Sequence, residues 1–174
     1  MHLQLPLSPF FYPILDAGLS TDLAGDARDV IRAGARILQV RAKKQTKKWI
    51  YEKMQEIIPL CNESNACCLI DDCVDIALVT DGAGVHLGQL DFPVREARAL
   101  LGSKVIGFST HNMDQFLAAG DLPADYVTIG PVSQQAPRRM QIRRSGSRRL
   151  RKLSGTKPNP LLPSAAFFRN RFRH

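Results

Sequence analysis

Short apolar runs alternate with longer amphipathic segments across residues 10–132, and few folds are compatible with such a pattern. The six apolar runs read FFYPIL, RILQVR, ACCLID, AGVHLG, KVIGFS and DYVTIG. Between them, segments such as residues 22–35 and 47–62 place their apolar residues at helical spacing. A strand followed by a helix, repeated along the chain, predicts a parallel sheet with right-handed crossovers. We therefore expect an α/β fold with six strands and five intervening helices.

Polar side chains gather where the predicted strands end. In a (β/α) barrel this rim is where active sites are built. We therefore predict a TIM (β/α)8 barrel that is incomplete, with about six βα strands present. An open doubly wound sheet is the alternative, but no glycine-rich dinucleotide loop follows the first predicted strand. The clusters are Gln39, Arg41 and Lys43; Asp71 and Asp72; His86, Gln89 and Asp91; and Ser109, Thr110 and His111.

The segment QVRAKK ends the second predicted strand with an amide and two cations. Strand alternation places Gln39, Arg41 and Lys43 on one face. An arginine binds two oxygens of a diphosphate at once, and a lysine adds a point charge. The trio therefore suits a diphosphate, and a solvated basic strand end is the alternative.

Carboxylates follow the next two predicted strands. Asp71 and Asp72 end one of them, and Asp91 closes the loop after the other. Mg²⁺ takes one or two protein carboxylates and completes its coordination with phosphate oxygen and water. Carboxylates beside a basic trio meet this need, and helix N-capping is the alternative for Asp72 and Asp91. Asp75 fits capping or the surface better than metal binding.

The segment GFSTHN brings Ser109, Thr110 and His111 to the start of a predicted helix. Hydroxyls and backbone N–H groups at such a position can hold an anion. His86 and His111 are candidates for catalytic bases. A polar histidine that merely lines the rim is the favoured interpretation of each.

Acidic residues stop at one point in the chain. Residues 1–132 hold 12 Lys and Arg and all 16 Asp and Glu, which gives a net charge of −4. Residues 133–174 hold the other 12 Lys and Arg and no acid, which gives +12. This composition, rich in Arg, Ser and Pro, predicts disorder. It also predicts that any nucleic-acid binding is non-specific and confined to the tail.

The cysteines and the N-terminal segment indicate a cytoplasmic protein without a membrane partner. The cysteines, at positions 61, 67, 68 and 73, lack the spacing of a zinc site and are expected to be reduced and buried. The first 15 residues have no basic start, and prolines break their apolar run, which argues against a signal peptide. No apolar run approaches the ~20 residues of a membrane span.

Five segments occur in the order and at the spacing of one enzyme family: ILQVRAK, LIDDCVDIAL, GAGVHLGQLDFP, VIGFSTHN and DYVTIGPV. Over residues 10–132 the chain resembles thiamine phosphate synthase. The resemblance implies a TIM-barrel transferase of thiamine biosynthesis that uses Mg²⁺. Such an enzyme joins 4-amino-2-methyl-5-(diphosphooxymethyl)pyrimidine to a thiazole phosphate and releases diphosphate. A thiazole tautomerase-like paralogue is the nearest alternative.

The resemblance also implies roles for individual residues. Gln39, Arg41 and Lys43 would hold the pyrimidine diphosphate, with Asp71 at the pyrimidine and Ser109 at the diphosphate. Asp72 and Asp91 would bind Mg²⁺. Arg41, Lys43 and Ser109 would be the catalytic residues. Asp71 stands where the family usually has Asn, and its retained neighbours favour the synthase over the tautomerase.

After the segment GPV the family usually continues with a loop that contacts the thiazole phosphate and supplies a lysine. Restoring one base at Val132, with codons chosen within degeneracy, converts residues 132–143 into VFATSSKKNADP, which contains such a loop. We therefore expect a partial synthase domain over residues 10–132 and a frameshifted tail over residues 133–174. The remaining alternative is a truncated, inactive remnant whose tail binds polyanions.

Overall fold

Strands and helices alternate along residues 11–130, the part of the chain that the computed structural model describes. The strands are β1 (Ile14–Asp16), β2 (Ile37–Arg41), β3 (Cys67–Asp71), β4 (Ala83–Leu87), β5 (Ile106–Thr110) and β6 (Tyr126–Ile129). The helices are α1 (Leu23–Arg32), α2 (Lys47–Glu63), α3 (Val74–Val79), α4 (Val94–Leu101) and α5 (Met113–Ala118), and the 3-10 turn η1 (Ala119–Asp121) follows α5. Within these residues the predicted six strands and five intervening helices are confirmed.

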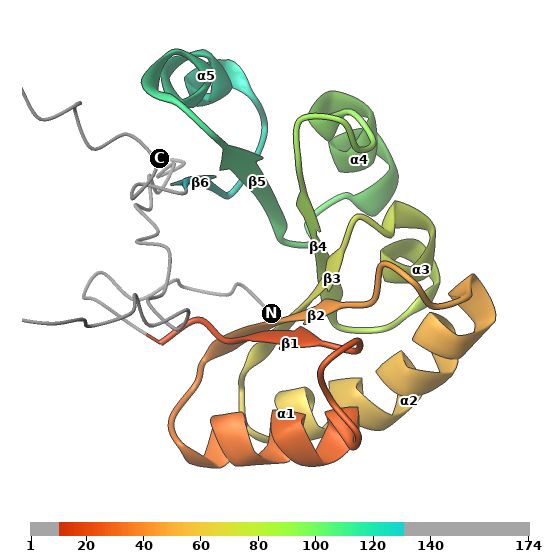
Figure 1. Cartoon of the computed structure of the whole chain (residues 1–174). Helices are drawn as coiled ribbons and strands as arrows, with labels where there is room; N and C mark the ends of the chain where they lie inside the picture. The colour runs from red at the N-terminus through yellow and green to blue at the C-terminus, as the bar shows by residue number, and fades with distance from the viewer. Residues whose placement is uncertain (1–10, 131–174) are drawn as a thin grey trace, which may run out of the picture.

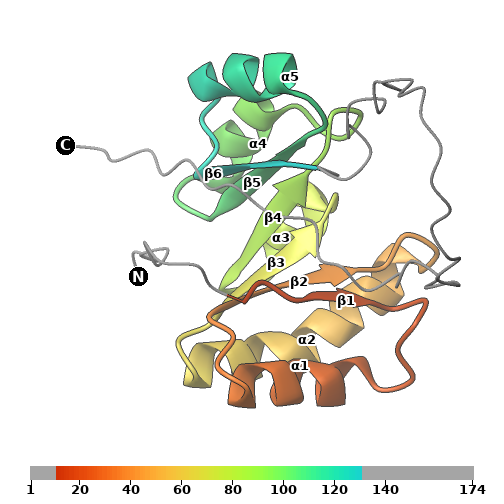
Figure 2. The same ribbon diagram turned by 60° about the vertical axis from the view of Figure 1, so that its left-hand side comes forward.

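The strands form one parallel sheet in the order in which they occur along the chain, from β1 to β6. A doubly wound sheet would reverse its strand order at a switch point, so that alternative is wrong. The sheet curves and carries its helices on the outer side (Figure 1; Figure 2). A TIM barrel closes with eight strands. Over residues 11–130 the sheet stays open between β1 and β6, which confirms the predicted incomplete barrel.

Strand alternation divides the side chains of the sheet between two faces. The outer face packs against the helices in one apolar core, to which β2 contributes Leu38 and Val40 and α2 contributes Met54 and Ile57. Each fully buried aliphatic side chain of this kind stabilises the fold by about 1.5–3 kcal/mol. The inner face holds a smaller apolar cluster of Ile37, Cys67, Leu69 and Tyr126. Polar side chains follow this cluster toward the carboxyl ends of the strands.

Local signals fix where each helix begins and ends. The side chains of Asp22, Thr46 and Asn112 accept hydrogen bonds from first-turn N–H groups of α1, α2 and α5, at 2.9, 3.2 and 2.9 Å. These bonds replace the partners that the first N–H groups of a helix lack. Helix α4 ends at Leu101, and its C-cap is Gly102, where φ is 59° and a residue with a side chain would be strained.

The predictions for the cysteines and for membrane spans can also be compared with the structure. The four cysteines are buried and free, and burial raises the pKa of Cys67 to about 12. Among residues 11–130, no helix is both long and apolar enough to span a bilayer. The predicted tail at residues 133–174 and both predicted domain boundaries, at residues 10 and 132, lie outside the described residues, so they stay predictions.

Candidate active site at the carboxyl ends of the strands

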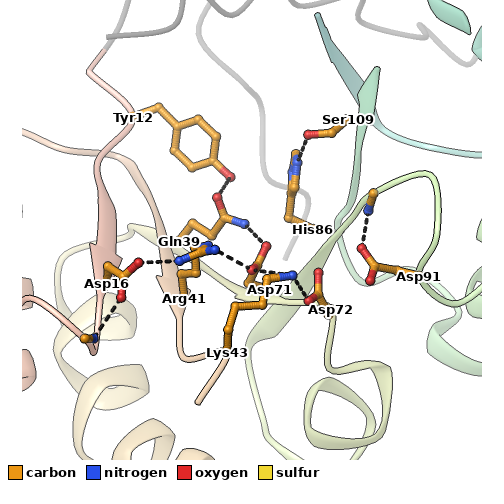
Figure 3. A network of polar contacts seen from close by, with 12 residues as sticks. Tyr12, Asp16, Gln39, Arg41, Lys43, Asp71, Asp72, His86, Asp91 and Ser109 are labelled. Atoms are coloured by element: carbon orange, nitrogen blue, oxygen red, sulfur yellow. Dashed lines mark hydrogen bonds and ion pairs between the residues drawn. The ribbon is translucent and has the colours of Figure 1, made fainter. Parts of the chain in front are cut away.

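Gln39, Arg41 and Lys43 converge on one carboxylate at the inner rim of the sheet (Figure 3). Gln39 Nε2 donates a hydrogen bond of 2.7 Å to Asp71 Oδ1 at the end of β3. Arg41 Nε lies 3.7 Å and Lys43 Nζ 3.3 Å from Asp71 Oδ2. The three side chains therefore share a face, as strand alternation predicts, and they surround the next strand's acid.

Asp16, the last residue of β1, joins this group by pairing with the guanidinium of Arg41. The backbone N–H of Gly18 donates to Asp16 Oδ1 at 2.8 Å. This hydrogen bond, together with Arg41, lowers the pKa of Asp16 below its usual value. Sequence reasoning missed Asp16, although it ends the first apolar run in the same way that Asp71 ends the third.

Burial dominates the electrostatics of Asp71. Only 10% of its side chain is exposed, and desolvation raises its pKa above the usual value, while Lys43 and Arg41 counteract part of the rise. Oδ2 accepts no hydrogen bond from the described residues, although both cations are near it. The position therefore holds a carboxyl group whose ionised form is only partly compensated.

Asp72 and Asp91 lie near each other beside Lys43 (Figure 3). Asp72 pairs with Lys43 Nζ, and Gly88 N donates to Asp91 Oδ2 at 2.6 Å. Burial raises the pKa of Asp72, and the carboxylate of Asp91 raises it further. Asp72 also has a φ of 61°, an uncommon conformation for a residue other than glycine that is often found at functional sites.

Neither aspartate caps the helix that follows it, so the N-capping alternative is wrong. Helix α3 begins after Cys73 and helix α4 after Pro93, and neither has a side-chain capping bond. Asp75, expected at a cap or on the surface, is exposed in the first turn of α3 and pairs with Lys47 at 2.8 Å.

The donor set at Asp72 and Asp91 fits a magnesium ion. The neighbouring carboxylate of Asp91 raises the pKa of Asp72, and a divalent cation between two such carboxylates would relieve this repulsion. No group of three His, Cys, Asp or Glu side chains within residues 11–130 is arranged to hold a metal. Mg²⁺ needs only one or two protein carboxylates when phosphate oxygens and water complete its coordination, so the two carboxylates are chemically suited to it.

The other half of the rim is neutral and is organised around His86 on β4. His86 Nε2 lies 2.7 Å from Ser109 Oγ, and His86 Nδ1 lies 2.8 Å from the hydroxyl of Tyr126. Burial lowers the pKa of His86 to about 4, so the imidazole is uncharged at neutral pH. An imidazole with so low a pKa is a weak base. This favours the interpretation of His86 as a polar side chain that lines the rim over that of a catalytic base. Tyr126 was missed, although it shares the inner parity of β6 with Thr128.

The structure separates the side chains of Ser109, Thr110 and His111, and the anion site expected from GFSTHN stays a prediction. Ser109 faces the inner rim, where its Oγ contacts Thr128 Oγ1 at 3.1 Å. Thr110 is buried and donates to Thr128 O at 2.8 Å, whereas His111 is exposed with Nδ1 3.0 Å from Gly130 O. Successive strand residues point to opposite faces, which separates Ser109 from Thr110.

The chain is similar in sequence to known thiamine-phosphate synthases. A model of the thiamine monophosphate synthase family matches residues 11–166. The thiamine-phosphate synthase of Methanosarcina barkeri is 40% identical over 131 residues, which is 74% of this chain and 59% of that protein. The thiamine-phosphate synthase of Methanosarcina mazei is 39% identical over 124 residues, 70% of this chain and 51% of that protein.

A solved structure is similar over the same share of the chain. Thiamine phosphate pyrophosphorylase from Pyrococcus furiosus superimposes with a TM-score of 0.65 at 29% identity, covering 70% of this chain and 60% of that one. The chain thus spans between half and two thirds of the length of these relatives.

Proposed function

This chain belongs to the thiamine monophosphate synthase family, and on that premise we propose that its rim is the pyrimidine-diphosphate half of a thiamine phosphate synthase site. The proposed reaction condenses 4-amino-2-methyl-5-(diphosphooxymethyl)pyrimidine with a thiazole phosphate. The bond between the pyrimidine methylene and the diphosphate breaks, and diphosphate leaves with the electron pair. The thiazole nitrogen then supplies its lone pair to the methylene carbon.

One observation carries this proposal: a basic trio and two candidate metal ligands converge within one network. Lys43 joins the two sets, since its Nζ pairs with Asp72 and lies 3.3 Å from Asp71 Oδ2. A diphosphate bound to Mg²⁺ needs both kinds of group at one place.

The charged side chains have partners that a diphosphate can replace. Arg41 is paired with Asp16, and Lys43 with Asp72, and both cations remain more than 40% exposed. On binding, we propose that Arg41 and Lys43 turn to phosphate oxygens, and that Gln39 and Asp71 orient the pyrimidine. Bound Mg²⁺, held by Asp72 and Asp91, would supply positive charge to the departing diphosphate. Arg41, Lys43 and Ser109 are proposed to stabilise the same developing charge.

At position 71 this chain has a carboxyl group, where the family that it resembles usually has the side-chain amide of Asn. A buried carboxyl group with a raised pKa can carry a proton and then donate it to a ring nitrogen, as an amide N–H would. The thiazole phosphate, in the resemblance, is held by the loop after Val132, which lies outside residues 11–130.

The proposal is tested by calorimetric titration of the full 174-residue chain with the pyrimidine diphosphate, with and without Mg²⁺. Binding is expected only with Mg²⁺. Asp72→Ala or Asp91→Ala should weaken it about 10- to 100-fold, the loss of one strong charged contact.

Asp75→Ala is the matched control, because Asp75 is a nearby carboxylate that pairs with Lys47 outside the network. It should bind like the original chain. Equal affinity with and without Mg²⁺, or full affinity in both rim variants, would contradict the metal assignment. A folded chain that binds no pyrimidine diphosphate would refute the proposed function.

A further inference from the structure

A continuous path of side-chain hydrogen bonds runs along the inner face of the sheet from Ser109 to Asp71. Figure 3 shows its two ends, Ser109 with His86 and Tyr12 with Gln39 and Asp71. The path joins the diphosphate side of the proposed site to the pyrimidine side, yet its middle members carry no role in the proposed reaction. The contacts are Ser109 Oγ to His86 Nε2 at 2.7 Å, His86 Nδ1 to Tyr126 Oη at 2.8 Å, Tyr126 Oη to Tyr12 Oη at 2.8 Å, Tyr12 Oη to Gln39 Oε1 at 3.4 Å, and Gln39 Nε2 to Asp71 Oδ1 at 2.7 Å.

The chemistry of Gln39 fixes the direction of the path at one end. Its amide nitrogen donates to Asp71, so its carbonyl oxygen is the atom that faces Tyr12. A carbonyl oxygen only accepts, so the single hydroxyl hydrogen of Tyr12 is directed at Gln39.

The remaining directions follow from counting hydrogens. Since Tyr12 uses its hydrogen toward Gln39, its contact with Tyr126 requires Tyr126 to donate. Tyr126 has then used its own hydrogen, so His86 Nδ1 must donate to it. A neutral imidazole with a hydrogen on Nδ1 has a bare Nε2, which accepts from the Ser109 hydroxyl.

The packing around His86 and Tyr126 is built for this contact. Tyr126 is fully buried and His86 is 7% exposed. Gly107 lies between them on β5. A methyl group in place of its hydrogen would overlap the phenol of Tyr126 and come within 2.5 Å of His86 Nδ1. The absence of a side chain at Gly107 therefore leaves room for the hydrogen bond between the His86 imidazole and the Tyr126 phenol.

The path has a second arrangement with the same number of protons. In it His86 carries its hydrogen on Nε2 and donates to Ser109, Tyr126 donates to His86 Nδ1, and Tyr12 donates to Tyr126. The Ser109 hydroxyl hydrogen is then directed either at Thr128 Oγ1, 3.1 Å away, or at a bound anion, and the carbonyl oxygen of Gln39 can accept from an outside N–H donor. A molecule with an amino group at one end and a phosphate at the other satisfies both new demands at once.

We propose that Tyr12, Tyr126 and His86 form a positioning relay that couples recognition of the substrate's amino group at Gln39 to recognition of its diphosphate at Ser109. This inference rests on the proposed function for the identity of the ligand. The relay itself, and the direction it has without ligand, stand on the geometry alone. It makes His86 a positioning residue for Ser109, with no proton transferred to the substrate.

The test is the protonation state of the two His86 nitrogens, read by NMR of the full chain labelled with ¹⁵N-histidine. Without ligand, His86 should carry its hydrogen on Nδ1. Tyr12→Phe removes one acceptor of the Tyr126 hydrogen and so favours donation from Tyr126 to His86 Nδ1, and the population should shift toward the Nε2–H form. Tyr51→Phe, a tyrosine 40% exposed on α2, is the matched control and should leave the signal unchanged.

A hydrogen on Nε2 in the unsubstituted, ligand-free chain would overturn the relay, as would an unchanged signal in a folded Tyr12→Phe protein. Ligands then separate the relay from the proposed function. The probes are Mg²⁺ with inorganic diphosphate, 4-amino-2-methylpyrimidine alone, and both together. If the two ends are coupled, the shift of His86 toward the Nε2–H form with both probes together should exceed the sum of the shifts with each probe alone. A shift equal to that sum would overturn the coupling. If Tyr12→Phe behaves as expected but the chain binds none of these probes, the relay stands and the proposed function fails.

Discussion

The rim carries paired charges at the ends of β1 to β3, which Asp91 joins from the loop after β4, whereas strands β4 to β6 themselves carry neutral side chains joined by hydrogen bonds. The cations of the charged half, Arg41 and Lys43, are 42% and 44% exposed, but Tyr126 in the neutral half is fully buried. Half-exposed ion pairs contribute about 0–1 kcal/mol because water screens them. Buried hydrogen-bonding groups cost about 1–3 kcal/mol when they lose a partner.

This difference suggests a division of work between the two halves. The charged half can exchange partners at little cost in stability, which suits binding and release of an anion. The neutral half holds its geometry because every rearrangement there must keep buried groups paired. Three predictions test this division, and they differ in the expected change in the free energy of unfolding.

The largest effect is expected from Gly107→Ala. The added methyl group cannot fit beside Tyr126 and His86, so one ring must move in a tightly packed interior. We expect a loss of about 3 kcal/mol, the upper part of the range for overpacked cores. Urea unfolding measures it, and Leu90→Ala, which truncates a side chain that is 99% exposed, is the control. A Gly107→Ala protein as stable as that control would mean that the neutral half is not rigid.

The next effect concerns pH. The pKa of His86 lies at about 4 in the folded chain against 6.5 for an ordinary histidine, so below pH 6.5 the unfolded chain binds a proton that the folded chain does not. Stability is therefore fully present above pH 6.5 and is lost as pH falls toward 4, by about 1.4 kcal/mol per pH unit and about 2 kcal/mol at pH 5. Unfolding series at several pH values measure this loss.

His86→Gln isolates the contribution of the imidazole, because the carboxylates of the charged half titrate in the same way in both proteins. The glutamine variant should lose less stability between pH 6.5 and 5 than the original chain. Parallel curves for the two proteins would show that His86 is already protonated in the folded state near neutral pH.

The smallest change in stability is expected from Arg41→Ala. Its pair with Asp16 is half-exposed, so unfolding should shift by no more than about 1 kcal/mol. Affinity for the pyrimidine diphosphate should fall about 10- to 100-fold, because a bidentate charged contact is lost. Calorimetry of binding and urea unfolding on the same sample give both numbers. A large loss of stability with unchanged affinity would reverse the proposed division.

Much of this molecule could be predicted from the sequence because the signals are local. The alternation of apolar runs with helical periods predicted the strands and helices, and parity along β2 predicted that Gln39, Arg41 and Lys43 share a face. Parity also accounts for the separation of the Ser109 and Thr110 side chains on β5. The meeting of Asp72 with Asp91 followed from the rule that parallel strands end at one rim.

Only the tertiary structure decided the contacts between residues that are far apart in the sequence and the protonation states that burial sets. Tyr12 and Tyr126 are 114 residues apart, and no period in the sequence relates them. The pairing of Asp16 with Arg41, the uncharged state of His86 and the raised pKa of Asp71 depend on which neighbours exclude water. Periodicity reports which way a side chain points, whereas burial and pairing depend on what the rest of the chain brings next to it.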